Sequence, residues 1–348
     1  MADGAVDRVG VARDRLDHGG KKGKRCEHGK LPIMKTTVHG GDLGEVRRRF
    51  PDAPLPWIDL STGINPVAYP VLPLPEESWT RLPTREAEER LLAAAAARYG
   101  VRDPATIVAA PGTQALIQLL PRLAPRSRVA ILGPTYEEHA LCWAAEGHEL
   151  VERDADVTVV VNPNNPTGRL LTPAELSNRG GLLIVDEAFM DFLPPEASIT
   201  ADLPSDTVVL RSFGKAYGLA GVRLGFAIAG KGMAGRLRQM LGPWAVSGPA
   251  LEIGRQALED SAWLQASARR LEADSRRLDA LLADASFGIE GGTALFRLAR
   301  HRDASGMATK LGRHGIHVRA FPKEPTWLRF GLPGSDAEFG RLARALAS

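Results

Sequence analysis

The sequence predicts an α/β protein with two lobes: a mainly parallel β-sheet with helices on both faces, and a smaller α+β domain. Between residues 76 and 240, short apolar stretches alternate with helical stretches, a pattern typical of a parallel sheet covered by helices. Several of these apolar stretches are continuous, as expected for strands that are buried on both faces. A chain of 348 residues also exceeds the usual size of one hydrophobic core, so two lobes are expected.

The elements are predicted in order along the chain. Residues 35–75 are expected to join the smaller domain, and residues 76–240 to form the large one. In the large domain we expect helices over Ala87–Tyr99 and Tyr136–Glu146, and strands over Arg128–Leu132, Val157–Val161 and Gly181–Asp186. The alanine run 93–97 favours the first of these helices. Residues 241–348 are expected to supply bridging helices up to 285 and then the small domain, with helices over Asp303–His314 and Asp336–Ala347.

Residues 1–34 differ from the rest of the chain. They are rich in glycine, basic through Lys21–Arg25, and lack both hydrophobic periodicity and the apolar segment of a signal peptide. We interpret them as a disordered leader, with Met34 as a candidate natural start. The basic run is more typical of a solvated tail than of a nucleic-acid-binding arm. Cys26, His28 and His18 do not have the spacing of a metal site, so no metal is expected.

Two polar residues follow predicted strands of the large domain. Asp186 ends the strand that begins at Gly181, and Asn165 lies in the Asn-Pro-rich stretch after Val161. Functional groups of open α/β sheets lie at the carboxyl ends of the strands, so both are candidate site residues. Asp186 would suit pairing with a protonated pyridine nitrogen. Two other interpretations stay open: a helix N-cap for Asp186 and an ordinary turn around Asn165.

Lys215 lies among small residues in the stretch 212–225, with Ser212 three positions before it and Arg223 eight positions after it. A lysine whose pKa is lowered by its surroundings can attack a carbonyl group, and pyridoxal phosphate chemistry requires such an amine. Ser212 and Arg223 could bind a phosphate monoester. The alternative is a glycine-rich loop with a solvated lysine.

These segments and their order resemble the fold-type I pyridoxal-phosphate enzymes, the aspartate aminotransferase superfamily. The resemblance covers residues 35–348 and implies a large domain built on a seven-stranded sheet. It also implies that Lys215 binds the cofactor covalently, that Asp186 pairs with its ring nitrogen and Asn165 with its phenolic oxygen, and that Ser212 and Arg223 hold its phosphate. A further set of cofactor contacts is implied for Gly112, Thr113, Gln114 and the ring-stacking Tyr136. Phosphate binding at residues 112–114 agrees with the attraction of a helix N-terminus for anions.

Within the superfamily, the chain resembles the branch that contains threonine-phosphate decarboxylases and histidinol-phosphate aminotransferases. His39-Gly-Gly and the later Ile64-Asn65-Pro66 are similar to the opening of the cobalamin-pathway decarboxylases, which implies substrate-binding roles for His39 and Asn65. The reaction implied is the conversion of L-threonine O-3-phosphate to (R)-1-amino-2-propanol O-2-phosphate. The alternatives are an aminotransferase acting on histidinol phosphate or a related compound, and a catalytically silent partner in cobalamin assembly. Without the resemblance, His39-Gly-Gly reads as a flexible turn.

Two short strands near the C-terminus carry one arginine each, Arg319 and Arg329. Converging arginines suit a small phosphorylated amino acid, because the guanidinium fork matches both carboxylate and phosphate. By resemblance, Arg329 would bind the substrate carboxylate and Arg319 its phosphate. The alternative is a pair of surface arginines on edge strands.

The sequence departs from the family pattern at two positions. Phe189 stands where many relatives have a tyrosine that donates to the phenolic oxygen, and Leu82 replaces a tyrosine that reaches the cofactor phosphate across a dimer. A homodimer is still expected by resemblance, whereas the cross-subunit bond is in doubt.

The bulk composition agrees with a cytoplasmic enzyme. The chain is 44% hydrophobic and 24% charged, and no apolar run reaches the length of a membrane-spanning helix. A net charge of +3 gives no indication of nucleic-acid binding, and two scattered cysteines cannot form a disulfide framework.

Overall fold

The computed structural model describes residues 40–348. The predicted leader, the three residues considered for a metal and His39 lie outside the described residues. None of the helices between residues 40 and 348 is both long and apolar enough to cross a bilayer.

The large sheet has seven strands. In spatial order they are β2 (Ile107–Ala110), β8 (Gly225–Ala229), β7 (Thr207–Ser212), β6 (Leu182–Asp186), β5 (Val157–Val161), β3 (Arg128–Ile131) and β4 (Glu149–Val151). The strands from β7 to β4 pair in parallel, and β8 is antiparallel to both of its neighbours. This arrangement confirms the predicted fold class.

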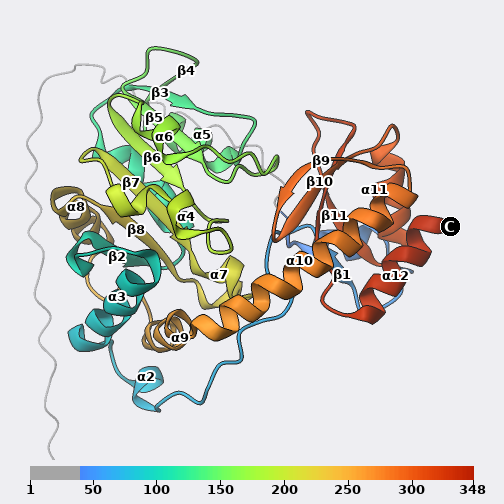
Figure 1. The fold of residues 1–348 in the computed structure, drawn as a ribbon, viewed down its shortest axis with the longest axis horizontal. Helices are drawn as coiled ribbons and strands as arrows, with labels where there is room; N and C mark the ends of the chain where they lie inside the picture. The colour runs from blue at the N-terminus through green and yellow to red at the C-terminus, as the bar shows by residue number, and fades with distance from the viewer. Residues whose placement is uncertain (1–39) are drawn as a thin grey trace, which may run out of the picture. The chain divides into compact units, whose positions relative to one another are not determined.

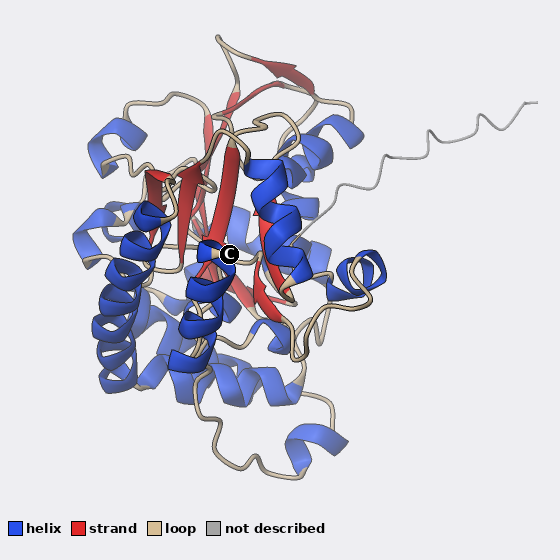
Figure 2. Cartoon of the chain, turned by 90° about the vertical axis from the view of Figure 1, so that its right-hand side faces the viewer, coloured by secondary structure: helices blue, strands red, loops and turns tan. Residues whose placement is uncertain are grey.

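Helices cover both faces of the large sheet (Figures 1 and 2). Ile184 and Leu210 belong to the core under α4 (Thr113–Leu119), α5 (Glu137–Ala145) and α8 (Lys231–Leu241). Val185 and Val209 face the opposite core, under α3 (Arg85–Tyr99) and α9 (Gly248–Glu259). Successive side chains of a strand point to opposite faces, so β6 and β7 contribute to both cores.

The small sheet has five strands, in the order β1 (Ile58–Leu60), β11 (Ile316–Ala320), β12 (Trp327–Gly331), β10 (Phe296–Arg300) and β9 (Gly288–Thr293). Its core includes buried residues of α10 (Ser261–Asp284), α11 (Ala304–Arg313) and α12 (Asp336–Ala347). Figure 1 shows α10 running from α9 to this sheet. The shorter helices are α1 (Leu43–Arg49), α2 (Glu77–Thr80), α6 (Pro173–Ser177) and α7 (Phe213–Ala216), together with five 3₁₀ turns.

Local sequence explains where the helices begin and end. Helix α3 begins two residues before the predicted Ala87, because the Thr84 side chain accepts a hydrogen bond from the backbone N–H of Ala87 and so caps an earlier first turn. The helix ends at Gly100, which has a left-handed conformation. Helix α6 begins with a capping box formed by Thr172 and Glu175. The other predicted elements are present with bounds that differ by at most one residue.

The segment after β1 links the small sheet to the large domain. The backbone N–H of Asn65 donates to the carbonyl of Lys215 at 2.9 Å, and that of Tyr69 donates to the carbonyl of Tyr217 at 2.8 Å. Residues 35–75 were expected to join the smaller domain as a whole. In the structure β1 pairs with β11, whereas Tyr69 belongs to the core of the large sheet. The exact domain boundaries stay a prediction.

Gly218→Ala should destabilise the protein by about 1–3 kcal/mol. Gly218 has φ of +65°, and a Cβ there would lie 2.7 Å from the Asn65 carbonyl oxygen and 2.8 Å from Ala68 Cα. Urea unfolding would measure the loss. The control is Gly221→Ala, where no atom lies within 4 Å of the added Cβ, and its effect should stay within about 0.5 kcal/mol. Equal effects of the two substitutions would contradict this account.

Candidate active site

The predicted cofactor residues gather at one edge of the large sheet. Asp186 is the last residue of β6, Ser212 is the last residue of β7, and Asn165 lies in the turn after β5. Because β5, β6 and β7 are parallel neighbours, their carboxyl ends meet at the same edge. Lys215 follows Ser212 on the short helix α7.

Lys215 has an environment that favours its neutral amine. Burial lowers the pKa of Lys215, the nearby Asp186 carboxylate opposes this change, and the positive charges of Arg329 and Arg223 add to it. The Lys215 Nζ also lies 5.2 Å from the centroid of the Phe189 ring. A neutral amine in this position can attack a carbonyl carbon and can accept a proton at Nζ.

Asp186 is buried and held by two donors. Its Oδ2 lies 3.0 Å from Nε2 of His139, and its Oδ1 accepts a hydrogen bond from the Ala188 N–H at 3.1 Å. Burial raises the pKa of Asp186, but the hydrogen bond and charge of His139 and the charge of Lys215 outweigh it, so the net pKa is lowered. A carboxylate that stays ionised is what pairing with a protonated ring nitrogen requires.

The predicted phosphate-binding part of the site consists of Gly112, Arg223 and the first turn of α4. Gly112 caps α4 with φ of +84°, and no side chain bonds to the first turn of that helix. A Cβ at Gly112 would lie only 2.6 Å from Nη2 of Arg223, so the lack of a side chain leaves room for this guanidinium. A Cβ at Gly225 would similarly collide with the backbone N–H of Thr113, at 2.6 Å. Ser212 is paired with Gly225 across β7 and β8, which places it at the same end.

Tyr136 is held by Gln114. The Tyr136 hydroxyl donates to Oε1 of Gln114 at 3.1 Å, and Nε2 of Gln114 donates to Glu138 at 3.0 Å. Burial raises the pKa of Tyr136 to about 12, with the negative charges of Glu138 and Asp186 adding to the effect. Tyr136 therefore keeps its proton at neutral pH and acts as a hydrogen-bond donor.

Arg329 joins the two sheets through neutral oxygens. It donates to Oδ1 of Asn165, and its Nη2 donates to the Ser61 carbonyl at 2.7 Å. Burial and the like charge of Arg319 lower the pKa of Arg329 to about 10. Because an arginine can only donate, it fixes the Asn165 amide with its oxygen toward β12, which leaves Nδ2 of Asn165 for another acceptor.

Arg319 and Arg329 lie directly opposite each other. They are register partners in the antiparallel pair of β11 and β12. Burial lowers the pKa of Arg319, which the charge of Glu137 opposes. Two partly desolvated guanidinium groups side by side, one of which lowers the pKa of the other, mark a region that would favour a bound anion.

Asn65 and Phe189 shape the wall of the site. Nδ2 of Asn65 donates to the Ala216 carbonyl at 2.8 Å, and its Oδ1 accepts from Arg270 at 2.6 Å, so this side chain braces the backbone next to Lys215. Its predicted contact with substrate stays a prediction. Phe189 packs edge-on against Phe296, with ring centroids 5.1 Å apart, and requires glycine at position 63, where a Cβ would lie 2.8 Å from its ring.

Sequence reasoning missed His139, Ser61 and Arg270. His139 lies in the first turn of α5, three residues after the N-cap residue Tyr136, and the two rings meet edge-on with centroids 6.2 Å apart, so its closeness to Tyr136 in the sequence could have indicated it. No sequence signal indicates Ser61, because its backbone carbonyl makes the contact with Arg329. Arg270 belongs to α10, and only the folded chain brings it to Asn65.

The described residues fit pyridoxal phosphate. The amine of Lys215, the ionised Asp186 and the guanidinium of Arg223, which packs against Gly112, match its aldehyde, ring nitrogen and phosphate respectively. Nδ1 of His139 and Nε of Arg329 are buried without a hydrogen-bond partner among residues 40–348. Within the same residues, no group of three or more His, Cys, Asp or Glu side chains could hold a metal ion.

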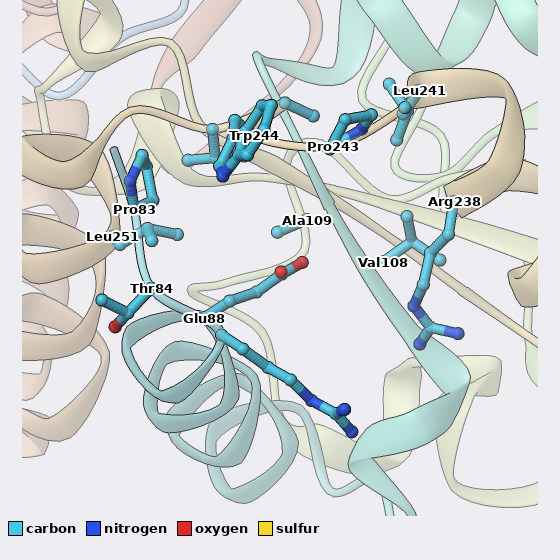
Figure 3. Close-up of a pocket in the computed structure, with 14 residues that line it drawn as sticks. Pro83, Thr84, Glu88, Val108, Ala109, Arg238, Leu241, Pro243, Trp244 and Leu251 are labelled. Carbon is cyan, nitrogen blue, oxygen red and sulfur yellow. The ribbon is translucent and has the colours of Figure 1, made fainter. Parts of the chain in front are cut away.

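A separate cavity of about 260 Å³ lies between α3, β2 and the loop after α8 (Figure 3). Pro83, Glu88, Arg238 and Trp244 are among the residues that line it. It contains none of the predicted cofactor or substrate residues.

Comparisons with known proteins identify relatives of this chain. The family model for aminotransferase class I and II matches residues 73–346. A threonine-phosphate decarboxylase of Pseudomonas aeruginosa is 42% identical over 88% of this chain and 96% of its own length. A second one, from a Sinorhizobium species, is 44% identical over 89% of this chain and 97% of its own. The fold matches a histidinol-phosphate aminotransferase of Sinorhizobium meliloti, solved with pyridoxal-5'-phosphate, with a TM-score of 0.77, 21% identity and coverage of 92% and 96%.

Phe189→Tyr should lower the pH at which the visible absorption band of the cofactor-loaded protein titrates by about one unit. A hydroxyl at this position would donate to the cofactor's phenolic oxygen and stabilise the deprotonated form by about 1.4 kcal/mol. Spectrophotometric pH titration measures the midpoint, and Phe50→Tyr, at the end of α1, serves as control. Identical midpoints for Phe189→Tyr and the unsubstituted protein would remove this account.

Lys215→Met should make the cofactor-free protein more stable at pH 7 and remove part of the dependence of its stability on pH. A lysine whose pKa is lower in the folded state binds fewer protons there, so stability rises as pH increases from the folded pKa toward the unfolded value of about 10.4. Thermal unfolding from pH 7 to 10 measures both effects. The variant should also lose the visible chromophore and the borohydride-stable link to the cofactor; an unchanged chromophore would show that another group binds it.

Proposed function

Because the chain belongs to the aminotransferase class I and II family, whose cofactor here is pyridoxal 5'-phosphate, we propose that it decarboxylates L-threonine O-3-phosphate. The product would be (R)-1-amino-2-propanol O-2-phosphate, a building block for cobalamin. The family resemblance noted in the sequence is confirmed by the family model and by the two relatives that are 42% and 44% identical.

The observation that carries the proposal is the register of Arg319 opposite Arg329. L-Threonine O-3-phosphate has a carboxylate and a phosphate in one small molecule, and each would suit one guanidinium fork. Arg329 is fixed by Asn165 and Ser61, so the carboxylate that it binds would have a defined direction. Arg319 would then hold the phosphate.

The protein would control the reaction mainly by orientation. Bound pyridoxal phosphate withdraws electrons from the substrate α-carbon, which allows carbon dioxide to leave. Arg319 and Arg329 would hold the substrate so that the bond to the carboxylate, rather than the Cα–H bond, is the one that breaks. Lys215, with its lowered pKa, would hold or return a proton at Nζ. Asp186 stays ionised beside His139 and would keep the ring nitrogen protonated.

Two parallel assays test the proposed reaction. The cofactor-loaded protein is incubated with L-threonine O-3-phosphate, and separately with histidinol phosphate and 2-oxoglutarate. We expect carbon dioxide and the aminopropanol phosphate in the first assay and no glutamate in the second. Glutamate formation would favour the aminotransferase instead. Cofactor binding without turnover in either assay would favour a catalytically silent partner.

Arg319→Met should lower kcat/KM for L-threonine O-3-phosphate by about 10- to 100-fold, because it removes one charge-assisted anion contact worth about 1.4–2.7 kcal/mol. The visible spectrum of the bound cofactor should not change. Steady-state kinetics provide the measurement, and Arg313→Met, an exposed position at the end of α11, is the matched control. A kcat/KM equal to that of Arg313→Met would show that Arg319 does not bind the substrate.

We also propose that the protein is a homodimer. Large apolar side chains at Leu72, Trp79, Leu82 and Trp244 are exposed in the single chain. Three of them adjoin α9 or the loop before it: Pro83, next to Leu82, lines the cavity of Figure 3 together with Trp244, and Ser78, next to Trp79, lies against Gly248 at the start of α9. Leu72 donates from its N–H to Gln256 of the same helix at 3.2 Å. Exposed apolar groups gathered in this way are typical of protein interfaces. Sedimentation of the protein and its Trp244→Glu variant tests this: a shift of the variant to the monomer is expected. A cytoplasmic location stays a prediction.

A further inference from the structure

A buried ion triad lies on the face of the large sheet opposite to Asp186. Arg211 donates from Nη1 to Glu187 and from Nη2 to Asp191, at 3.0 Å each. The three residues are 4%, 0% and 6% exposed. The guanidinium also lies 4.4 Å from the centroid of the Tyr99 ring, at the end of α3.

Glu187 and Asp191 make further hydrogen bonds, whereas Nε of Arg211 and Oδ2 of Asp191 are buried without a hydrogen-bond partner in the described part of the chain. Glu187 accepts from the Ser198 hydroxyl at 2.6 Å and from the Ile199 N–H at 3.2 Å. The backbone carbonyl of Asp191 accepts from Arg98 at 2.9 Å. These bonds come from α3 and from the 3₁₀ turns after β6, so they anchor the triad to neighbouring elements.

Glu187 and Arg211 are each adjacent in the sequence to a predicted cofactor residue. Glu187 directly follows Asp186, and Arg211 directly precedes Ser212. Because side chains alternate along a strand, Asp186 and Ser212 share the face of Ile184 and Leu210, whereas Glu187 and Arg211 share that of Val185 and Val209. A bond between Glu187 and Arg211 therefore fixes the spacing of Asp186 and Ser212 on the other face.

Asp191, the third residue of the triad, holds the loop after β6 in the same way. Asp191 lies two residues after Phe189, whose ring is 5.2 Å from Nζ of Lys215. Arg211 and Arg98 hold Asp191 by its side chain and its backbone respectively. The position of Phe189 beside Lys215 thus depends on the same guanidinium.

We propose that Arg211, Glu187 and Asp191 are positioning residues, which set the relative placement of Asp186, Ser212 and Phe189 around the cofactor without touching it. The proposal holds whichever reaction the enzyme catalyses. A buried ion triad is a poor source of stability, because apolar residues of similar volume often stabilise a fold as well or better. The planar guanidinium of Arg211 binds one carboxylate oxygen of Glu187 and one of Asp191. This geometry is suited to holding β7, the end of β6 and the loop after β6 in fixed positions.

The test compares two variants of the cofactor-loaded protein. Arg211→Lys keeps the charge but loses the fork, and Arg211→Met/Glu187→Gln/Asp191→Asn removes all three charges together. For both we expect cofactor dissociation constants at least about 10-fold higher, as when the residues that orient metal ligands are replaced, and a changed visible circular dichroism of the bound cofactor. The KM for L-threonine O-3-phosphate should stay unchanged while kcat falls, since the arginines of the small sheet are untouched.

Leu342→Ala is the control for a general loss of stability. Leu342 is fully buried in α12, in the core of the small sheet, so its truncation should lower the melting temperature and leave the cofactor's dissociation constant and circular dichroism unchanged. Arg211→Lys and the uncharged variant should differ from each other in melting temperature but not in their cofactor defect. Wild-type cofactor affinity and circular dichroism in either of these two variants would overturn the proposal. So would a defect of equal size in Leu342→Ala. The cofactor measurements do not depend on the reaction, so they remain informative if no decarboxylation occurs.

Discussion

The parallel pairing of β6 with β7 is the constraint on which the site depends. It places the carboxylate of Asp186 one strand away from the segment that carries Ser212 and Lys215. His139 and the charge of Lys215 lower the pKa of Asp186, and the Asp186 carboxylate in turn opposes the loss of charge at Lys215. Each group therefore sets the protonation of the other. Without this pairing, the sequence would hold a lysine and an aspartate 29 positions apart with no common ligand.

The charges around this pair are mostly positive. Burial lowers the pKa of Lys215, Arg319 and Arg329, and the charges of Arg329 and Arg223 lower the pKa of Lys215 further. The hydrogen bonds that hold Arg329 go to neutral groups, an amide oxygen and a backbone carbonyl, which fix its position without cancelling its charge. Burying these positive charges without a counter-ion is unfavourable, and a bound anion would stabilise them. A phosphorylated cofactor and a phosphorylated substrate both meet this requirement.

The segment from Ser61 to Tyr69 connects the two sheets at the point where the chemistry would occur. The carbonyl of Ser61 holds Arg329 of the small sheet, and Asn65 holds the backbone at Lys215 and Ala216 of the large domain. Arg270 of α10 reaches the same Asn65. Arg329 and Lys215 are thus positioned by one short stretch of chain. A change in this stretch would affect both.

The sequence by itself determined the fold class, most element bounds and the residue types of the site. Apolar periodicity, caps and glycines are local signals, and the ordered segments around Asn165, Asp186 and Lys215 are specific enough to identify the family. Contacts between residues far apart in the chain could not be predicted in this way. Only the tertiary structure paired Asp186 with His139, gave Asn65 its bracing role and enclosed Arg211 between Glu187 and Asp191. The physical reason is that these bonds depend on burial and on strand register, which arise when distant segments pack together, and no local pattern encodes them.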